Sequence, residues 1–215
     1  MNNIYHIIIL IGFGLSTFLV FKKESSFYLK TFSPFLAFSL LIEYSGVYLS
    51  KKGIHTIPLY DVSGIIEFCF YLWVFYSILI SSLVKRIVLY LIIGFPSLSI
   101  INMFFFQGIN NFNSTTYSLG CLMIIFLCIF YFFELFNTQI NFRLSNDPAF
   151  WICTGLLFFY SVSFPIFVSA NLMKHFSAKL GELIFFVVGV MNIILYSLFC
   201  VAFICQLKLK KENNK

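Results

Sequence analysis

The chain has 215 residues, and 60% of them are hydrophobic while only 10% are charged, with a formal net charge of +6. A soluble fold of this size cannot bury so much apolar surface, and about a quarter of the residues in a globular chain are charged. The composition therefore excludes a soluble protein and predicts an all-α integral membrane protein.

Seven segments are long and apolar enough to be transmembrane helices. A helix needs about 20 mainly apolar residues to cross the hydrocarbon core, where no water can satisfy the backbone groups. A β-barrel is excluded because its strands alternate apolar and polar residues. We expect one seven-helix domain over residues 1–215, with no soluble domain. The expected helices are Ile4–Phe21, Ser33–Ser50, Val62–Val84, Ile87–Phe106, Thr116–Phe136, Pro148–Ala170 and Leu183–Cys205.

Two features of these segments bear on their arrangement. The turn between the third and fourth helices is expected at Lys85 and Arg86, so close that the two could form one re-entrant hairpin; we expect separate helices. Pro34 and Pro148 start the second and sixth helices, which suggests a 3+1+3 arrangement of the kind found in transporters with repeats.

The basic residues predict the orientation, because short loops rich in Lys and Arg stay on the cytoplasmic side. Ten basic residues fall on one side of the expected helices, which places the N-terminus outside and the C-terminus in the cytoplasm of a bacterial inner membrane. Their spread over short loops favours contact with membrane lipid and excludes nucleic acid as a partner. The four basic residues on the outer side are Lys51, Lys52, Lys174 and Lys179.

The six cysteines and three histidines predict neither a metal site nor a cofactor. No two cysteines form a C-x-x-C pair, and none lies near a histidine at the spacing of metal ligands. All six cysteines fall inside expected helices, where they are typical of small apolar packing residues.

Glu43 and Glu67 are the two charged residues that lie deepest in apolar sequence. A charge at the centre of a span costs at least ~2.5 kcal/mol. Glu43 precedes Lys51 by eight residues and Glu67 follows Asp61 by six, so both carboxyls lie roughly 8 to 12 Å from the outer helix ends. Consecutive helices are usually neighbours, and we expect the two acids to face one outward cavity. Glu134 lies near an inner helix end, where it can reach the interface.

Small and polar residues continue along the helix faces that carry these acids, at spacings of three and four. The seventh helix has a similar face. Such faces also suit close helix packing without a ligand, so a purely structural polar interface is the alternative. The predicted ligand-binding residues are Glu43, Tyr44, Tyr60, Glu67, Tyr71 and Asn192.

Two carboxylates held close together repel one another, so they share a proton or recruit a cation. We therefore expect a small polar or cationic ligand, and a role as a sensor or as the membrane partner of a signalling protein. A compact proton-coupled transporter is the alternative; Pro96 and Pro165 are the candidates for the broken helices that transporters use. A lipid-modifying enzyme would need a nucleophile or metal that the sequence does not reveal.

The segment Ile42-Glu43-Tyr44-Ser45-Gly46, with Leu59-Tyr60-Asp61, Ile66-Glu67-Phe68 and then Tyr71, resembles a family of uncharacterised small seven-span proteins from Bacteroidota. In that family an acid and a glycine end the second span, a Tyr-Asn pair precedes the third, and Glu-Phe with a nearby Tyr lies within it. Asp61 stands here in place of the Asn. The resemblance implies the seven-span topology and no particular activity.

Overall fold

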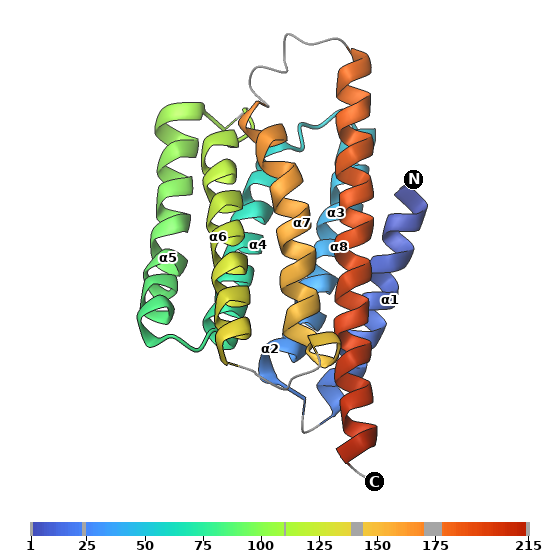
Figure 1. Cartoon of the computed structure of the whole chain (residues 1–215). Coiled ribbons are helices and arrows are strands. Elements are labelled where there is room, and N and C mark those ends of the chain that lie inside the picture. The colour runs from blue at the N-terminus through green and yellow to red at the C-terminus, as the bar shows by residue number, and fades with distance from the viewer. Residues whose placement is uncertain (1, 23–24, 110, 139–143, 170–177, 214–215) are drawn as a thin grey trace. The chain divides into compact units, whose positions relative to one another are not determined.

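The computed structural model describes residues 2–22, 25–109, 111–138, 144–169 and 178–213. These residues form helices, and no strand occurs among them. Seven helical segments of the described chain are long and apolar enough to cross a membrane (Figure 1), which confirms the predicted all-α class and the number of candidate spans.

The helices follow the expected order, with short additional turns between them. A four-residue helix precedes α3 and belongs to the same candidate span, and a π-helical turn extends α5. The bounds are α1 Asn2–Phe21, α2 Phe27–Lys30, α3 Phe32–Lys51, α4 Ile57–Ile78, α5 Ser82–Ile101, η1 Asn102–Gln107, α6 Ser114–Thr138, η2 Leu144–Asn146, α7 Pro148–Val168 and α8 Ala178–Asn213.

The predicted bounds of the third helix were wrong at both ends. Pro58 lies in the first turn of α4, where the missing N–H would have had no helical partner, so the helix begins at Ile57. It ends before Leu79, which has an extended backbone. The turn lies at 79–81 because the Ser81 hydroxyl accepts a hydrogen bond from the Val84 N–H at 3.5 Å and caps α5. Apolar residues on both sides of the turn hide it from a hydropathy pattern.

Lys85 and Arg86 consequently lie inside α5, and α4 and α5 are two separate helices of membrane length that pack side by side (Figure 1). Ala170, predicted to end the sixth span, lies outside the described residues, as do Arg143 and Lys174 of the predicted basic loops.

The chain forms two compact units. The first contains the described residues of 1–40, 128–159 and 185–215, and the second those of 41–127 and 160–184. Four long helices, α3, α6, α7 and α8, contribute residues to both units.

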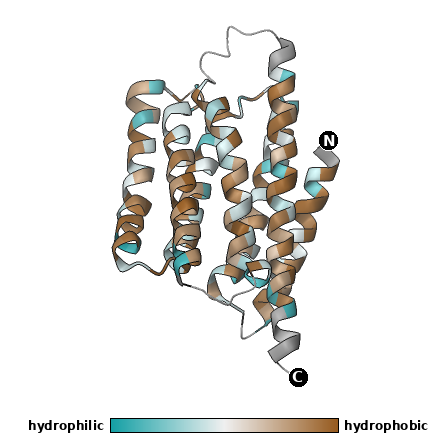
Figure 2. Ribbon diagram, viewed as in Figure 1, coloured by the Kyte–Doolittle hydropathy of each residue, from teal (hydrophilic) through white to brown (hydrophobic). Residues whose placement is uncertain are grey.

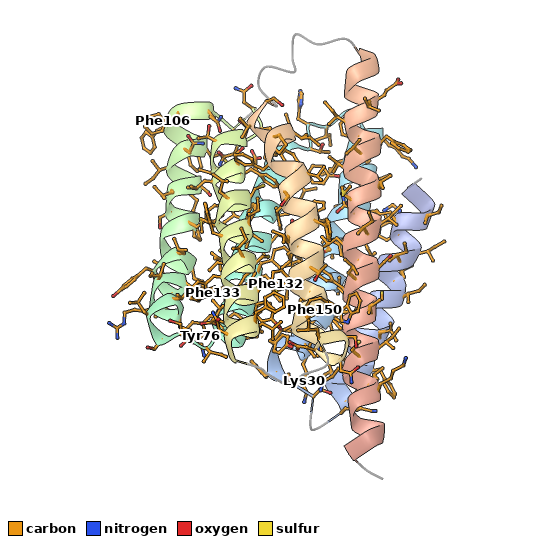
Figure 3. All side chains as sticks on the ribbon, viewed as in Figure 1. Lys30, Tyr76, Phe106, Phe132, Phe133 and Phe150 are labelled. Atoms are coloured by element: carbon orange, nitrogen blue, oxygen red, sulfur yellow. The ribbon has the colours of Figure 1, made fainter. Side chains whose placement is uncertain are left out.

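Aromatic side chains fill the core of the first unit. The fully buried Phe32 packs edge-on against Phe199 and Phe203 of α8, with ring centroids 5.2 and 5.5 Å apart. Phe132 and Phe150 meet in the same way at 5.8 Å, and both are labelled in Figure 3. Such edge-to-face pairs add to the packing between helices.

The second unit is built around Phe68 of α4. Its buried ring contacts Phe95, Tyr117 and Tyr160, with centroids 5.2, 5.0 and 5.4 Å away. The ring lies directly over Gly120 of α6, where a Cβ would be 2.7 Å from the ring atoms. A small residue at this position is what lets the backbone of α6 approach α4.

Large apolar side chains also cover the outer faces of the helices. Figure 2 shows hydrophobic residues along their length, with hydrophilic ones at helix ends and turns. Phe106 is 79% exposed and projects away from η1 (Figure 3). Faces of this kind are stable against lipid and would be an aggregation hazard in water.

Replacing Gly120 with Ala is expected to destabilise the protein by about 1–3 kcal/mol, because the added methyl group must displace the enclosed Phe68 ring. The matched control is Gly94→Ala in α5, where a Cβ meets no atom within 4 Å; it should leave stability unchanged or raise it by up to about 1 kcal/mol. Detergent-induced unfolding in mixed micelles measures both. Equal stability of the two variants would contradict the close approach at Gly120.

Candidate functional site

The Glu67 carboxyl lies near the middle of α4 and is held by a tyrosine from another helix. Its Oε1 atom accepts a hydrogen bond of 3.1 Å from the hydroxyl of Tyr160 in α7. Tyr160 and Tyr71 are fully buried, and their rings meet edge-on at 6.1 Å. The carboxyl of Glu67 is thus placed among aromatic rings, deep in a helix of membrane length.

Glu43 of α3 belongs to the same part of the second unit. Its carboxylate interacts electrostatically with the Glu67 carboxylate and with the Tyr60 hydroxyl. The Tyr60 side chain lies against Gly46, one turn after Glu43, so closely that a Cβ there would overlap its hydroxyl. Gly46 therefore lets α3 and α4 approach each other beside the two acids. We call Glu43, Tyr60, Glu67, Tyr71 and Tyr160 the Glu67 cluster.

Of the other two predicted ligand-binding residues, one is exposed and the other belongs to the first unit. Tyr44 follows Glu43 on α3 and is 58% exposed. Asn192 is half-buried on α8 and belongs to the first unit. That all six predicted residues form a ligand pocket remains a prediction. Sequence reasoning did not single out Tyr160, because one more tyrosine in an aromatic-rich helix carries no distinguishing signal.

A second polar cluster surrounds Asp61, which lies near the start of α4 and is only 6% exposed. Its Oδ1 atom accepts a hydrogen bond of 3.1 Å from the backbone N–H of Asn113, just before α6. The Asn113 side chain donates to the Ser99 carbonyl of α5 at 3.0 Å. Asp61 thereby links α4 to the N-terminal end of α6. The Asn113 side chain links the same end of α6 to α5.

Hydrogen bonds extend this network through the π-helical turn. The Asn102 amide donates to the side-chain oxygens of Asn113 and Gln107. The Gln107 amide in turn donates to the hydroxyls of Ser114 and Thr115, both at 3.1 Å. A π-helical turn is rare and occurs frequently at functional sites. Here it positions the amides that bridge the end of α5 and the start of α6.

A small cavity lies beside Asp61 in the second unit. The space that the centre of a water molecule can occupy in this cavity is about 10 Å³, which is enough for roughly one water molecule. Two of its lining residues carry buried oxygens, Asp61 Oδ2 and Ser99 Oγ, that have no hydrogen-bond partner among the described residues. The lining residues are Asp61, Gly64, Ile65, Phe95, Ser99, Asn113, Thr116 and Tyr117.

From the sequence, Asp61 was expected near the membrane surface, and no ligand-binding role was predicted for it. It lies one turn inside α4, and the surrounding structure buries it. The available signal was the polar segment 107–116, rich in Asn, Ser and Thr, that follows the fourth span. Nothing in the sequence shows that this segment folds back onto α4.

Comparison of the chain with protein-family models, with curated proteins and with solved structures found no match. Among the described residues, no three His, Cys, Asp or Glu side chains are grouped as they would be around a metal ion.

Tyr160→Phe is expected to lower stability by about 1–3 kcal/mol, because it removes a hydrogen bond to the half-buried carboxyl group of Glu67. The control is Tyr90→Phe, whose hydroxyl lies on an exposed residue of α5 and should be dispensable. A double-mutant cycle with Glu67→Gln measures the coupling directly, and we expect at least about 0.5 kcal/mol. A coupling of zero would show that the tyrosine and the acid act independently.

Proposed function

We propose that this protein is a multi-pass protein of a bacterial inner membrane that binds a small cationic ligand at the Glu67 cluster. It acts as a sensor or as the membrane partner of a signalling protein. The observation that carries the proposal is the carboxyl of Glu67 in mid-helix, hydrogen-bonded to Tyr160 and near enough to a second acid, Glu43, for the two carboxylates to repel each other.

The composition of the cluster favours a cation over a neutral or anionic ligand. Acids within membrane spans are costly and are typical of ligand or ion sites. Two acids and three tyrosines supply negative charge, hydroxyl groups and aromatic faces, and none of the five residues is basic. Aromatic faces attract ammonium groups, most strongly where water is excluded. A protonated amine would therefore find both charge and aromatic contact.

The proposed topology opens the site to the outside. With the N-terminus outside, α3 runs outward and α4 inward, so Gly46 and Tyr60 lie on the outer side of the two acids. The basic residues of the inner side, which include Lys85 and Arg86 of α5, would then face anionic lipid and a cytoplasmic partner.

A proton-coupled transporter is the second candidate, and the α5 geometry favours it. Pro96 lies within α5, and six residues later the helix changes to the π-helical turn η1. Transporters use irregular helices next to their binding sites, commonly in repeated halves such as a 3+1+3 arrangement.

The binding proposal is tested by thermal unfolding of the purified protein with the chloride salts of ethanolamine, choline and putrescine. We expect at least one of these amines to raise the melting temperature in a saturable way. Glu67→Gln should abolish the shift, because it removes the charge and keeps the size of the side chain. Glu134→Gln, which removes a carboxylate from α6 outside the cluster, should preserve it. A shift that persists in Glu67→Gln would refute binding at this cluster.

Sensor and transporter are separated with proteoliposomes loaded with the amine that binds. Counterflow of labelled amine that Glu67→Gln abolishes would indicate transport. Saturable binding without counterflow, under any proton gradient, would favour the sensor.

A further inference from the structure

We infer that the cavity beside Asp61 is a binding site for a single monovalent alkali cation of about the size of sodium. This site is separate from the Glu67 cluster and does not depend on the function proposed for that cluster. Asp61 and Ser99 are its principal ligands, and the Thr116 hydroxyl lies in the same lining.

The first argument is the pair of buried oxygens without partners. Ser99 is 1% exposed and Asp61 6%, yet Asp61 Oδ2 and Ser99 Oγ have no hydrogen-bond partner among the described residues. Leaving such a group unsatisfied is destabilising, and more so where it is charged. Both residues line the same small cavity, so a single species bound there could satisfy both oxygens at once.

The second argument is charge. Among the described residues that line the cavity, Asp61 is the one acid and none is basic. A buried carboxylate without a positive partner is strongly disfavoured in a low-dielectric interior. One monovalent cation neutralises it. A divalent ion such as calcium takes six to eight oxygen ligands at 2.3–2.6 Å and commonly more than one carboxylate, which this lining lacks.

The third argument is the type of the ligands. Carboxylate and hydroxyl oxygens are hard ligands, which suit alkali and alkaline-earth ions better than transition metals. The volume of about 10 Å³ admits one atomic ion and excludes an organic amine.

The competing explanation is that Asp61 only caps α6. The hydrogen bond from the Asn113 N–H to Oδ1 is a capping contact and stabilises the negative charge of Asp61. Under this explanation one buried water molecule, for which the cavity has room, satisfies Oδ2 and the Ser99 hydroxyl. The two explanations differ in whether stability depends on the identity of the cation in solution.

The test is thermal unfolding of the purified full chain in sodium chloride and in caesium chloride, a larger ion, at equal ionic strength. Sodium at about 100 times its dissociation constant should raise the melting temperature by about 5–10 °C relative to caesium. Asp61→Asn should abolish this difference, since the amide keeps the capping oxygen and loses the charge. Ser99→Ala should weaken sodium binding by about tenfold or more.

Ser118→Ala is the matched control. Ser118 is also buried, its hydroxyl also has no partner among the described residues, and it lies outside the cavity lining. It should retain the full sodium response. Equal loss in Ser99→Ala and Ser118→Ala would overturn the proposal, because it would show a general effect of removing buried hydroxyls.

Direct binding of radioactive sodium to the wild-type protein covers the case in which a variant fails to fold. Saturable binding that excess unlabelled sodium displaces, and that ethanolamine, choline and putrescine do not, supports the site. No sodium binding, or binding lost in Glu67→Gln and retained in Asp61→Asn, overturns it. Failure of the amine experiments with an intact sodium response would refute only the function proposed for the Glu67 cluster.

Discussion

The packing of α4 against α6 through Phe68 and Gly120 is the contact on which both polar clusters of the second unit depend. Phe68 lies one residue after Glu67 and within two turns of Asp61, so the position of its ring sets where both acids lie. Its aromatic neighbours come from three other helices, and one of them, Tyr160, is also the hydrogen-bond donor to Glu67. A single aromatic core therefore holds the helices together and positions the polar groups between them.

The two acids of α4 are accommodated in different ways. Glu67 is far from any helix end and receives a hydrogen bond from a tyrosine side chain. Tyrosine suits this place because its ring is apolar while its hydroxyl can donate a hydrogen bond. Asp61 is close enough to the end of α4 to reach the free N–H groups at the start of α6, where the helix dipole also stabilises negative charge. The first arrangement leaves a carboxyl among aromatic faces, which suits an organic cation. The second leaves one carboxylate oxygen without a partner on a residue that lines a small cavity, which suits a small ion.

Hydropathy predicted the helices well because every backbone group in a membrane must be satisfied within a long apolar helix. It failed at the turn between α4 and α5, where Leu79 and Ile80 are as apolar as the helices themselves and the Ser81 cap decides the boundary. For the candidate site, the cost of a buried charge was enough to single out Glu43 and Glu67. The same reasoning did not single out Asp61, because it considered only how far a residue lies from the end of its helix. Asp61 lies near that end and is nevertheless buried by a neighbouring segment of the chain.

The amino-acid sequence by itself determined the class of protein and the number of candidate spans, and it singled out the two acids that lie deepest in apolar sequence, since each follows from composition and spacing along one helix. Only the tertiary structure decided the partners of the two acids of α4. Tyr160 is 93 residues from Glu67, and Asn113 is 52 residues from Asp61. Such pairs arise from the approach of helix backbones at small residues such as Gly46 and Gly120, and no local pattern encodes which side chain will lie opposite.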